Sequence, residues 1–147
     1  MSSELLLAER EIELAHGRYA RACDDRDWAA FETVFAPDVT VEFRGFPTME
    51  GRDAVVATIQ SLLGGCGPTQ HLIGNFVITA AGKSAESRCY VRAFHAGLGD
   101  RAAVTYELFG DYRARWRRLP EGWRATHWTI GVQCELGDRS ILGPAVD

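Results

Sequence analysis

The spacing of apolar residues in the first half of the chain predicts helices. Apolar or small residues recur in steps of three and four from Leu5 to Ala22, so they form one stripe of an amphipathic helix. Asp27 is suited to cap a second, short helix over residues 28–35. Helical spacing returns over residues 53–63 and stops at a glycine-rich turn. Three helices are therefore expected in this half.

Alternating apolar and polar residues predict strands, first a short one over residues 39–43. Four longer stretches follow, separated by turns that contain glycine or proline. They cover residues 70–79, 84–97, 103–119 and 122–134. Consecutive strands of this kind predict an antiparallel meander. Helices in one half and strands in the other predict an α+β domain in which the helices cover one sheet face and a pocket lies between the layers.

Composition limits the classes of protein and partner. With 147 residues, 46% of them apolar, the chain is expected to form a single domain over residues 1–147. A net charge of −4 argues against nucleic acid as a partner. The four cysteines are scattered, which argues against a zinc site and predicts a reducing, cytoplasmic location. The acidic N-terminus and the lack of a long apolar run predict neither a signal peptide nor a membrane association.

Strand parity identifies polar side chains that are expected inside the fold. His71 and Asn75 share a face of the first meander strand, and His95 shares a face of the next with small and apolar residues. Asp24 follows the first helix. The three ionisable groups could converge in one pocket. Each also has an ordinary interpretation, since an inward histidine can be a hydrogen-bonded core residue and Asp24 can be a helix cap.

Two other residues are expected nearer the surface. His16 is interpreted as a surface or interface residue. In the last strand both faces contain an indole, and Trp128 is expected to pack against a second chain. Assembly through the sheet into a homodimer or homotrimer is predicted on this basis.

Several segments together resemble a known family. Residues 19–28, which read Tyr-Ala-Arg-Ala-Cys-Asp-Asp-Arg-Asp-Trp, are similar to the end of a helix in the SnoaL-like branch of the nuclear-transport-factor-two-like superfamily, scytalone dehydratase type. Residues 69–74 and 90–95 resemble the two histidine-bearing strands of that family, and residues 122–124 its last strand. The resemblance spans about residues 9–135. It implies a cone-shaped α+β barrel, in which three N-terminal helices pack on a strongly curved, mainly antiparallel sheet.

The resemblance also implies a catalytic site. The matching aspartate, Asp24, would orient His71, and His95 would be the second acid/base group or the donor to a substrate oxygen. Such a site acts as a dehydratase, a lyase, and requires neither a metal nor an organic cofactor. Two tyrosines that fix a water in scytalone dehydratase are replaced here by Cys23 and Phe43, so scytalone itself is not the expected substrate.

The expected pocket is apolar and aromatic. It would bind an apolar or aromatic small molecule, specifically a cyclic, polyketide-like or steroid-like hydroxy-carbonyl compound. The residues expected to line it are Tyr19, Phe43, Ile59, Leu63, Ile73, Asn75, Val91 and Tyr112.

Other functions remain open on the sequence alone. A double-bond isomerase or a polyketide cyclase of the same fold would need a similar base and donor. A non-catalytic ligand-binding module or partner subunit is the alternative from another class, because fold does not imply function. An epoxide hydrolase with an Asp–Arg–Asp arrangement is disfavoured, since the inward strand faces contain no arginine.

Overall fold

The computed structural model describes residues 2–143 and contains two α-helices and three short 3₁₀ helices. The helical elements are α1 (Ser3–Asp24), η1 (Trp28–Thr33), α2 (Arg52–Gly64), η2 (Gly99–Arg101) and η3 (Arg139–Ile141). The helix α1 is capped by Ser2, whose hydroxyl accepts a hydrogen bond from the backbone N–H of Leu5. The predicted second helix is η1, a 3₁₀ helix of six residues.

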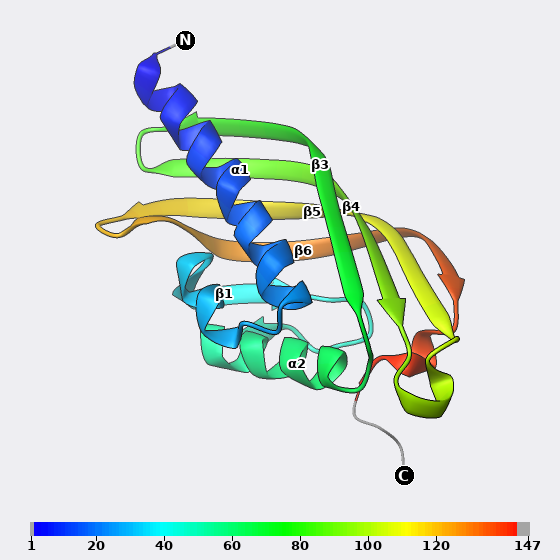
Figure 1. Cartoon of the computed structure of the whole chain (residues 1–147). Coiled ribbons are helices and arrows are strands. Elements are labelled where there is room, and N and C mark those ends of the chain that lie inside the picture. Colours follow the sequence, from blue (N-terminus) through cyan, green and yellow to red (C-terminus); the bar gives the residue numbers. More distant parts are fainter. Residues whose placement is uncertain (1, 144–147) are drawn as a thin grey trace.

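Six strands form one sheet. They are β1 (Phe35–Glu42), β2 (Met49–Glu50), β3 (Thr69–Ala81), β4 (Ser84–Ala96), β5 (Thr105–Leu119) and β6 (Gly122–Gly137). The order is β2-β1-β6-β5-β4-β3, and every neighbouring pair is antiparallel except β1 and β6, which are parallel. The sheet curls strongly but does not close on itself (Figure 1). This confirms the predicted α+β cone with a mainly antiparallel sheet.

The helix α1 lies across the concave face of the sheet, and α2 lies beside β1 at the other end (Figure 1). The apolar stripe predicted for α1 is the face that it buries, with Ile12, Ala15 and Tyr19 at 3% exposure or less. Each large apolar side chain that is buried in this way stabilises the fold by roughly 1.5–3 kcal/mol. The same packing brings Asp24, at the C-terminal end of α1, next to Thr69 and His71 in β3.

Irregularities in β3 and β6 change which side chains face inward. In β3 the pairing register with β4 shifts between Gly74 and Val77, and Asn75 within the bulge has φ = 56°. In β6 the register with β5 shifts at the pair Trp116↔Ala125. A one-residue insertion exchanges the two faces of the strand beyond it.

The prediction that Trp128 packs against a second chain is wrong. Its ring is fully buried within this chain, against Tyr19, Phe35 and Tyr112. The shift in β6 is the physical reason, because Ala125 and Trp128 then both face inward although their numbers differ by three.

The prediction for His16 is also wrong. Its side chain is fully buried, and its Nε2 lies 3.0 Å from the Ser87 hydroxyl oxygen, which also accepts a hydrogen bond from Trp116 Nε1. Burial lowers the pKa of His16 to about 3, so the ring is neutral at pH 7. His16 is therefore a hydrogen-bonded core residue.

Within residues 2–143, none of the helices combines the length and the apolar character that crossing a membrane requires.

Candidate active site

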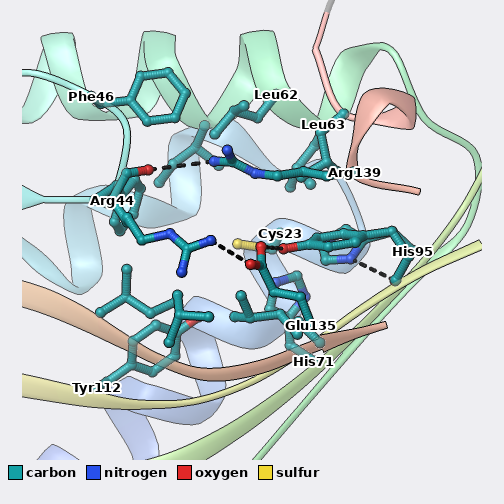
Figure 2. A pocket seen from close by; sticks show the side chains of 18 of the residues that line it. Cys23, Arg44, Phe46, Leu62, Leu63, His71, His95, Tyr112, Glu135 and Arg139 are labelled. Atoms are coloured by element: carbon teal, nitrogen blue, oxygen red, sulfur yellow. Dashed lines mark hydrogen bonds and ion pairs between the residues drawn. The ribbon is translucent and has the colours of Figure 1, made fainter. Parts of the chain in front are cut away.

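A cavity of about 110 Å³ lies between the end of α1, the helix α2 and the inner face of the sheet (Figure 2). Most of its wall is apolar or aromatic. Of the residues expected to line it, five do so, and both histidines also face it. These seven are Tyr19, Phe43, Ile59, Leu63, Tyr112, His71 and His95. The structure thus brings the two predicted histidines to one cavity.

Asp24 and His71 form a tight pair beside this cavity. Oδ1 of Asp24 lies 2.7 Å from Nδ1 of His71, and Oδ2 accepts a hydrogen bond of 2.9 Å from the backbone N–H of His71. The two side chains are 16% and 7% exposed, respectively. The carboxylate therefore fixes both the ring and the backbone of His71, as a carboxylate does in other histidine-based sites.

Two further residues hold the carboxylate in place. The Thr69 hydroxyl donates a hydrogen bond of 2.9 Å to Oδ1 of Asp24. The guanidinium of Arg26 in turn donates to the Thr69 hydroxyl oxygen at 2.8 Å and to the backbone carbonyls of Cys23 and Gly67 at 2.6 and 2.7 Å. Arg26 thereby joins the end of α1 to the segment that precedes β3.

The environment of Asp24 keeps it ionised. Burial alone raises the pKa of its carboxyl group, but the hydrogen bonds from His71 and Thr69 outweigh this effect and leave the pKa below its usual value. An ionised carboxylate can only accept, so Nδ1 of His71 carries the proton. Nε2 of His71 is then the basic nitrogen of the ring.

His95 has a different partner. Its Nδ1 lies 3.2 Å from the backbone carbonyl oxygen of Tyr106, which can only accept, so this nitrogen also carries a proton. Burial, followed by the repulsion that a protonated His71 would exert, lowers the pKa of His95 to about 4. His95 is therefore neutral at pH 7 and its Nε2 is an acceptor. This geometry favours an acceptor role over the alternative of a donor to the substrate oxygen.

Further hydrogen-bond donors line the wall of the cavity. Tyr19, Cys23 and Tyr112 are almost fully buried and border the cavity. Burial raises the pKa of both tyrosines well above the usual value, and it raises the pKa of the Cys23 thiol to about 12. All three keep their protons at neutral pH. Cys23 is thus not a nucleophile, whereas the phenols can donate hydrogen bonds.

Three residues expected in the pocket lie outside it. Asn75 is exposed, because the bulge in β3 turns it away from the face that carries His71. Ile73 and Val91 are paired neighbours on β3 and β4 and pack into the apolar core rather than the cavity wall. Ile73 and Val91 face the inside of the fold, as predicted, but α1 packs over this part of the sheet and separates them from the cavity.

Several residues of the site carried no signal in the sequence patterns. Arg26 and Thr69 support Asp24, and Arg44, Glu135 and Arg139 border the mouth of the cavity. The three arginines come from turns, loops or a short 3₁₀ helix. Parity along strands therefore could not detect them. In the described part of the chain, no group of three or more His, Cys, Asp or Glu side chains is arranged to hold a metal ion.

Comparison with known proteins agrees with this fold. The family model described as a SnoaL-like domain matches residues 4–129. The chain belongs to the SnoaL-like family. Among the relatives of this SnoaL-like protein, Rv2910c of Mycobacterium tuberculosis is 30% identical over 115 residues, which is 78% of each chain.

Solved structures are similar over nearly the whole SnoaL-like chain. Kfla4162 of Kribbella flavida has a TM-score of 0.85 and 22% identity, covering 92% of this chain and 96% of that one. The "Putative Scytalone Dehydratase" of Novosphingobium aromaticivorans has a TM-score of 0.83 and 20% identity, covering 96% and 94%. At these identities the likeness shows the shared fold.

Proposed function

We propose that this protein is an acid/base enzyme that needs no cofactor and dehydrates a small β-hydroxy-carbonyl compound, with Asp24, His71 and His95 as its catalytic site. The observation that carries the proposal is the 2.7 Å contact between Asp24 and Nδ1 of His71 beside a cavity that both histidines line. An oriented, neutral imidazole is the side chain best suited to accept a proton near pH 7.

The reaction begins with removal of the proton next to the substrate carbonyl. Nε2 of His71 accepts this proton, and the ionised Asp24 stabilises the imidazolium that forms. The electron pair of the broken C–H bond becomes the carbon–carbon double bond as the C–O bond of the β-hydroxyl breaks. The imidazolium of His71 returns the proton to the departing oxygen, water leaves, and the neutral base is restored.

The other residues act on the substrate oxygens. The phenols of Tyr112 and Tyr19 donate hydrogen bonds to the carbonyl oxygen, where negative charge develops as the proton leaves. Nε2 of His95 accepts a hydrogen bond from the β-hydroxyl and directs the leaving group toward His71. Because His95 is neutral, it orients this hydroxyl without donating a proton.

The cavity limits the size of the substrate. An engineered apolar cavity of about 150 Å³ holds benzene, so a cavity of about 110 Å³ holds no more than one ring. The polycyclic and steroid-like compounds expected from the sequence would have to extend out through the mouth of the cavity. We therefore propose a substrate with a single ring, or a short aliphatic chain, whose remaining part reaches the mouth.

The experiment that tests the proposal is an ultraviolet assay with a β-hydroxyketone that carries one phenyl ring. Dehydration produces a conjugated enone, whose absorbance rises. We expect turnover by the wild-type protein and a loss of about 10²–10⁴-fold in the His71→Ala variant. No turnover of this compound, together with rapid conversion of a β,γ-unsaturated ketone, would instead identify an isomerase. Absence of both reactions would favour a ligand-binding module.

The cytoplasmic location and the homodimer or homotrimer stay predictions from the sequence. Binding of a small-molecule ligand, without nucleic acid or a membrane as partner, is part of the proposal.

A further inference from the structure

A charged cluster borders the mouth of the cavity, on the side away from the Asp24–His71 pair. Glu135 extends from β6, and its Oε1 accepts a hydrogen bond of 2.6 Å from the Tyr106 hydroxyl. Its Oε2 is bonded by Arg44, which follows β1. The carboxylate of Glu135 is thus fully engaged by two neighbours. It holds the guanidinium of Arg44 in a fixed position at the rim.

A second cation at the same rim has no such partner. Arg139 extends from η3, and its Nη2 donates only to the backbone carbonyl oxygen of Arg44, at 3.4 Å. Within residues 2–143 no carboxylate lies within 4.0 Å of its guanidinium. Gly45, which has φ = 87°, lies beside both terminal nitrogens of this guanidinium. Figure 2 shows Arg139 between the Arg44–Glu135 pair and the side chains of Leu62 and Leu63.

The charges at the mouth do not cancel. Among residues 2–143, two guanidinium groups face one carboxylate, which leaves one positive charge beside a cavity whose wall is otherwise largely apolar. A guanidinium binds a carboxylate through two parallel hydrogen bonds, and Arg139 has donors free for this. The adjacent Glu135 disfavours a dianion. The mouth therefore suits a singly charged anion, and a carboxylate has the matching planar geometry.

We propose that Arg139 binds a carboxylate of the substrate at the mouth of the cavity, beside the Arg44 that Glu135 and Tyr106 hold in place. This inference rests on the proposed function and names the substrate class of that site. The hydroxy-carbonyl end of the molecule occupies the apolar cavity beside His71 and His95. The substrate is then a small hydroxy-carbonyl compound that also carries a carboxylate.

The test is a calorimetric comparison of phenylpropionate and its amide, which share a ring and differ in charge, at pH 7 and low ionic strength. We expect the wild-type protein to bind the carboxylate about 10-fold or more tightly than the amide. Arg139→Gln should weaken binding of the carboxylate to the level of the amide and leave the amide unaffected. Arg92→Gln, on the outer sheet face and similarly exposed, is the matched control and should retain the preference.

The inference is overturned if the wild type binds both compounds equally, if it binds neither, or if Arg92→Gln and Arg139→Gln have the same effect. Its failure is separable from that of the proposed function. If the preference for a carboxylate persists in His71→Ala but the wild type turns over no hydroxyketone, the anion site is supported and the proposed enzymatic function is contradicted. Turnover of a neutral hydroxyketone without any preference for a carboxylate would support the proposed function and contradict the anion site.

Discussion

The imidazole of His71 lies edge-on to that of His95, with 5.7 Å between the ring centroids and 82° between the planes. Both rings turn Nδ1 away from the cavity, one toward a carboxylate and the other toward a backbone carbonyl. Both rings line the same cavity, and within residues 2–143 neither Nε2 has a hydrogen-bond partner. The two histidines are chemically different, because only His71 has a carboxylate to stabilise its protonated form.

The first prediction concerns Asp24. In Asp24→Asn the amide can still accept from Thr69, but it cannot stabilise an imidazolium and can force the wrong tautomer on His71. We expect turnover of the hydroxyketone to fall by about 10²-fold or more, with little change in the affinity for phenylpropionate. The exposed neighbour offers a matched control, since Asp25→Asn should retain full turnover. Equal effects of the two substitutions would exclude the orienting role.

The second prediction concerns the donor to the substrate carbonyl. Tyr112→Phe removes one hydroxyl from the cavity wall and keeps the buried ring, so the fold should remain intact. We expect a loss of about 10²-fold in kcat. Tyr90→Phe, on the exposed outer face of β4, should have no effect. If Tyr112→Phe retained the wild-type kcat while Tyr19→Phe lost it, the donor would be Tyr19 instead.

The third prediction concerns Arg26 as a positioning residue. Arg26→Met leaves the acceptors on Cys23, Gly67 and Thr69 without their donor, and Thr69 then holds Asp24 less firmly. We expect kcat to fall about 10-fold, with an unchanged affinity for phenylpropionate. Arg21→Met, exposed near the end of the same helix, is the control. A purely structural role would instead lower ligand affinity and thermal stability together.

The three residues of the proposed catalytic site illustrate what could be predicted from the sequence. His71 and His95 share the inner faces of adjacent strands because side chains alternate along regular strands. Asp24 reaches His71 because α1 packs on β3, which its apolar stripe already indicates. The assignment of Asp24 to the site, however, could be predicted only from the family resemblance. The helix pattern alone predicts that Asp24 is a helix cap.

What could not be predicted has two physical causes. Bulges interrupt the alternation, so Asn75 turns outward and Trp128 turns inward, and neither bulge has a distinct signature in the pattern of residues. Loops and turns bring in the remaining charges. Arg26, Arg44 and Arg139 reach the site from irregular segments, where neither period applies.

The fourth prediction concerns stability against acid. His16 and His95 have pKa values lowered by burial to about 3 and about 4, below the value near 6.5 that they have when unfolded. The unfolded chain therefore binds protons that the folded chain does not, and stability falls as pH decreases from about 6.5 toward 4. Each histidine contributes a slope of about 1.4 kcal/mol per pH unit in this range.

Urea unfolding at several pH values measures this slope. In His16→Phe, whose ring would pack among Phe76, Trp116 and Trp128, the slope between pH 6 and pH 4 should decrease by about one proton. A slope unaffected by His16→Phe would show that His16 titrates normally in the folded protein.

The central claim is that His71 is a general base facing the cavity. The most direct test uses a ketone that carries one phenyl ring and measures how fast its α-protons exchange with deuterium from D₂O. The exchange requires only removal of a proton by the base, so the test applies equally to a dehydratase and to an isomerase. The exchange is measured by proton NMR. We predict that the wild-type protein accelerates exchange by about 10²-fold or more over buffer, and that the control variant His127→Ala does the same. The His71→Ala variant should exchange at the rate of buffer. Exchange that persists in His71→Ala, or its absence in the wild type, would contradict the account.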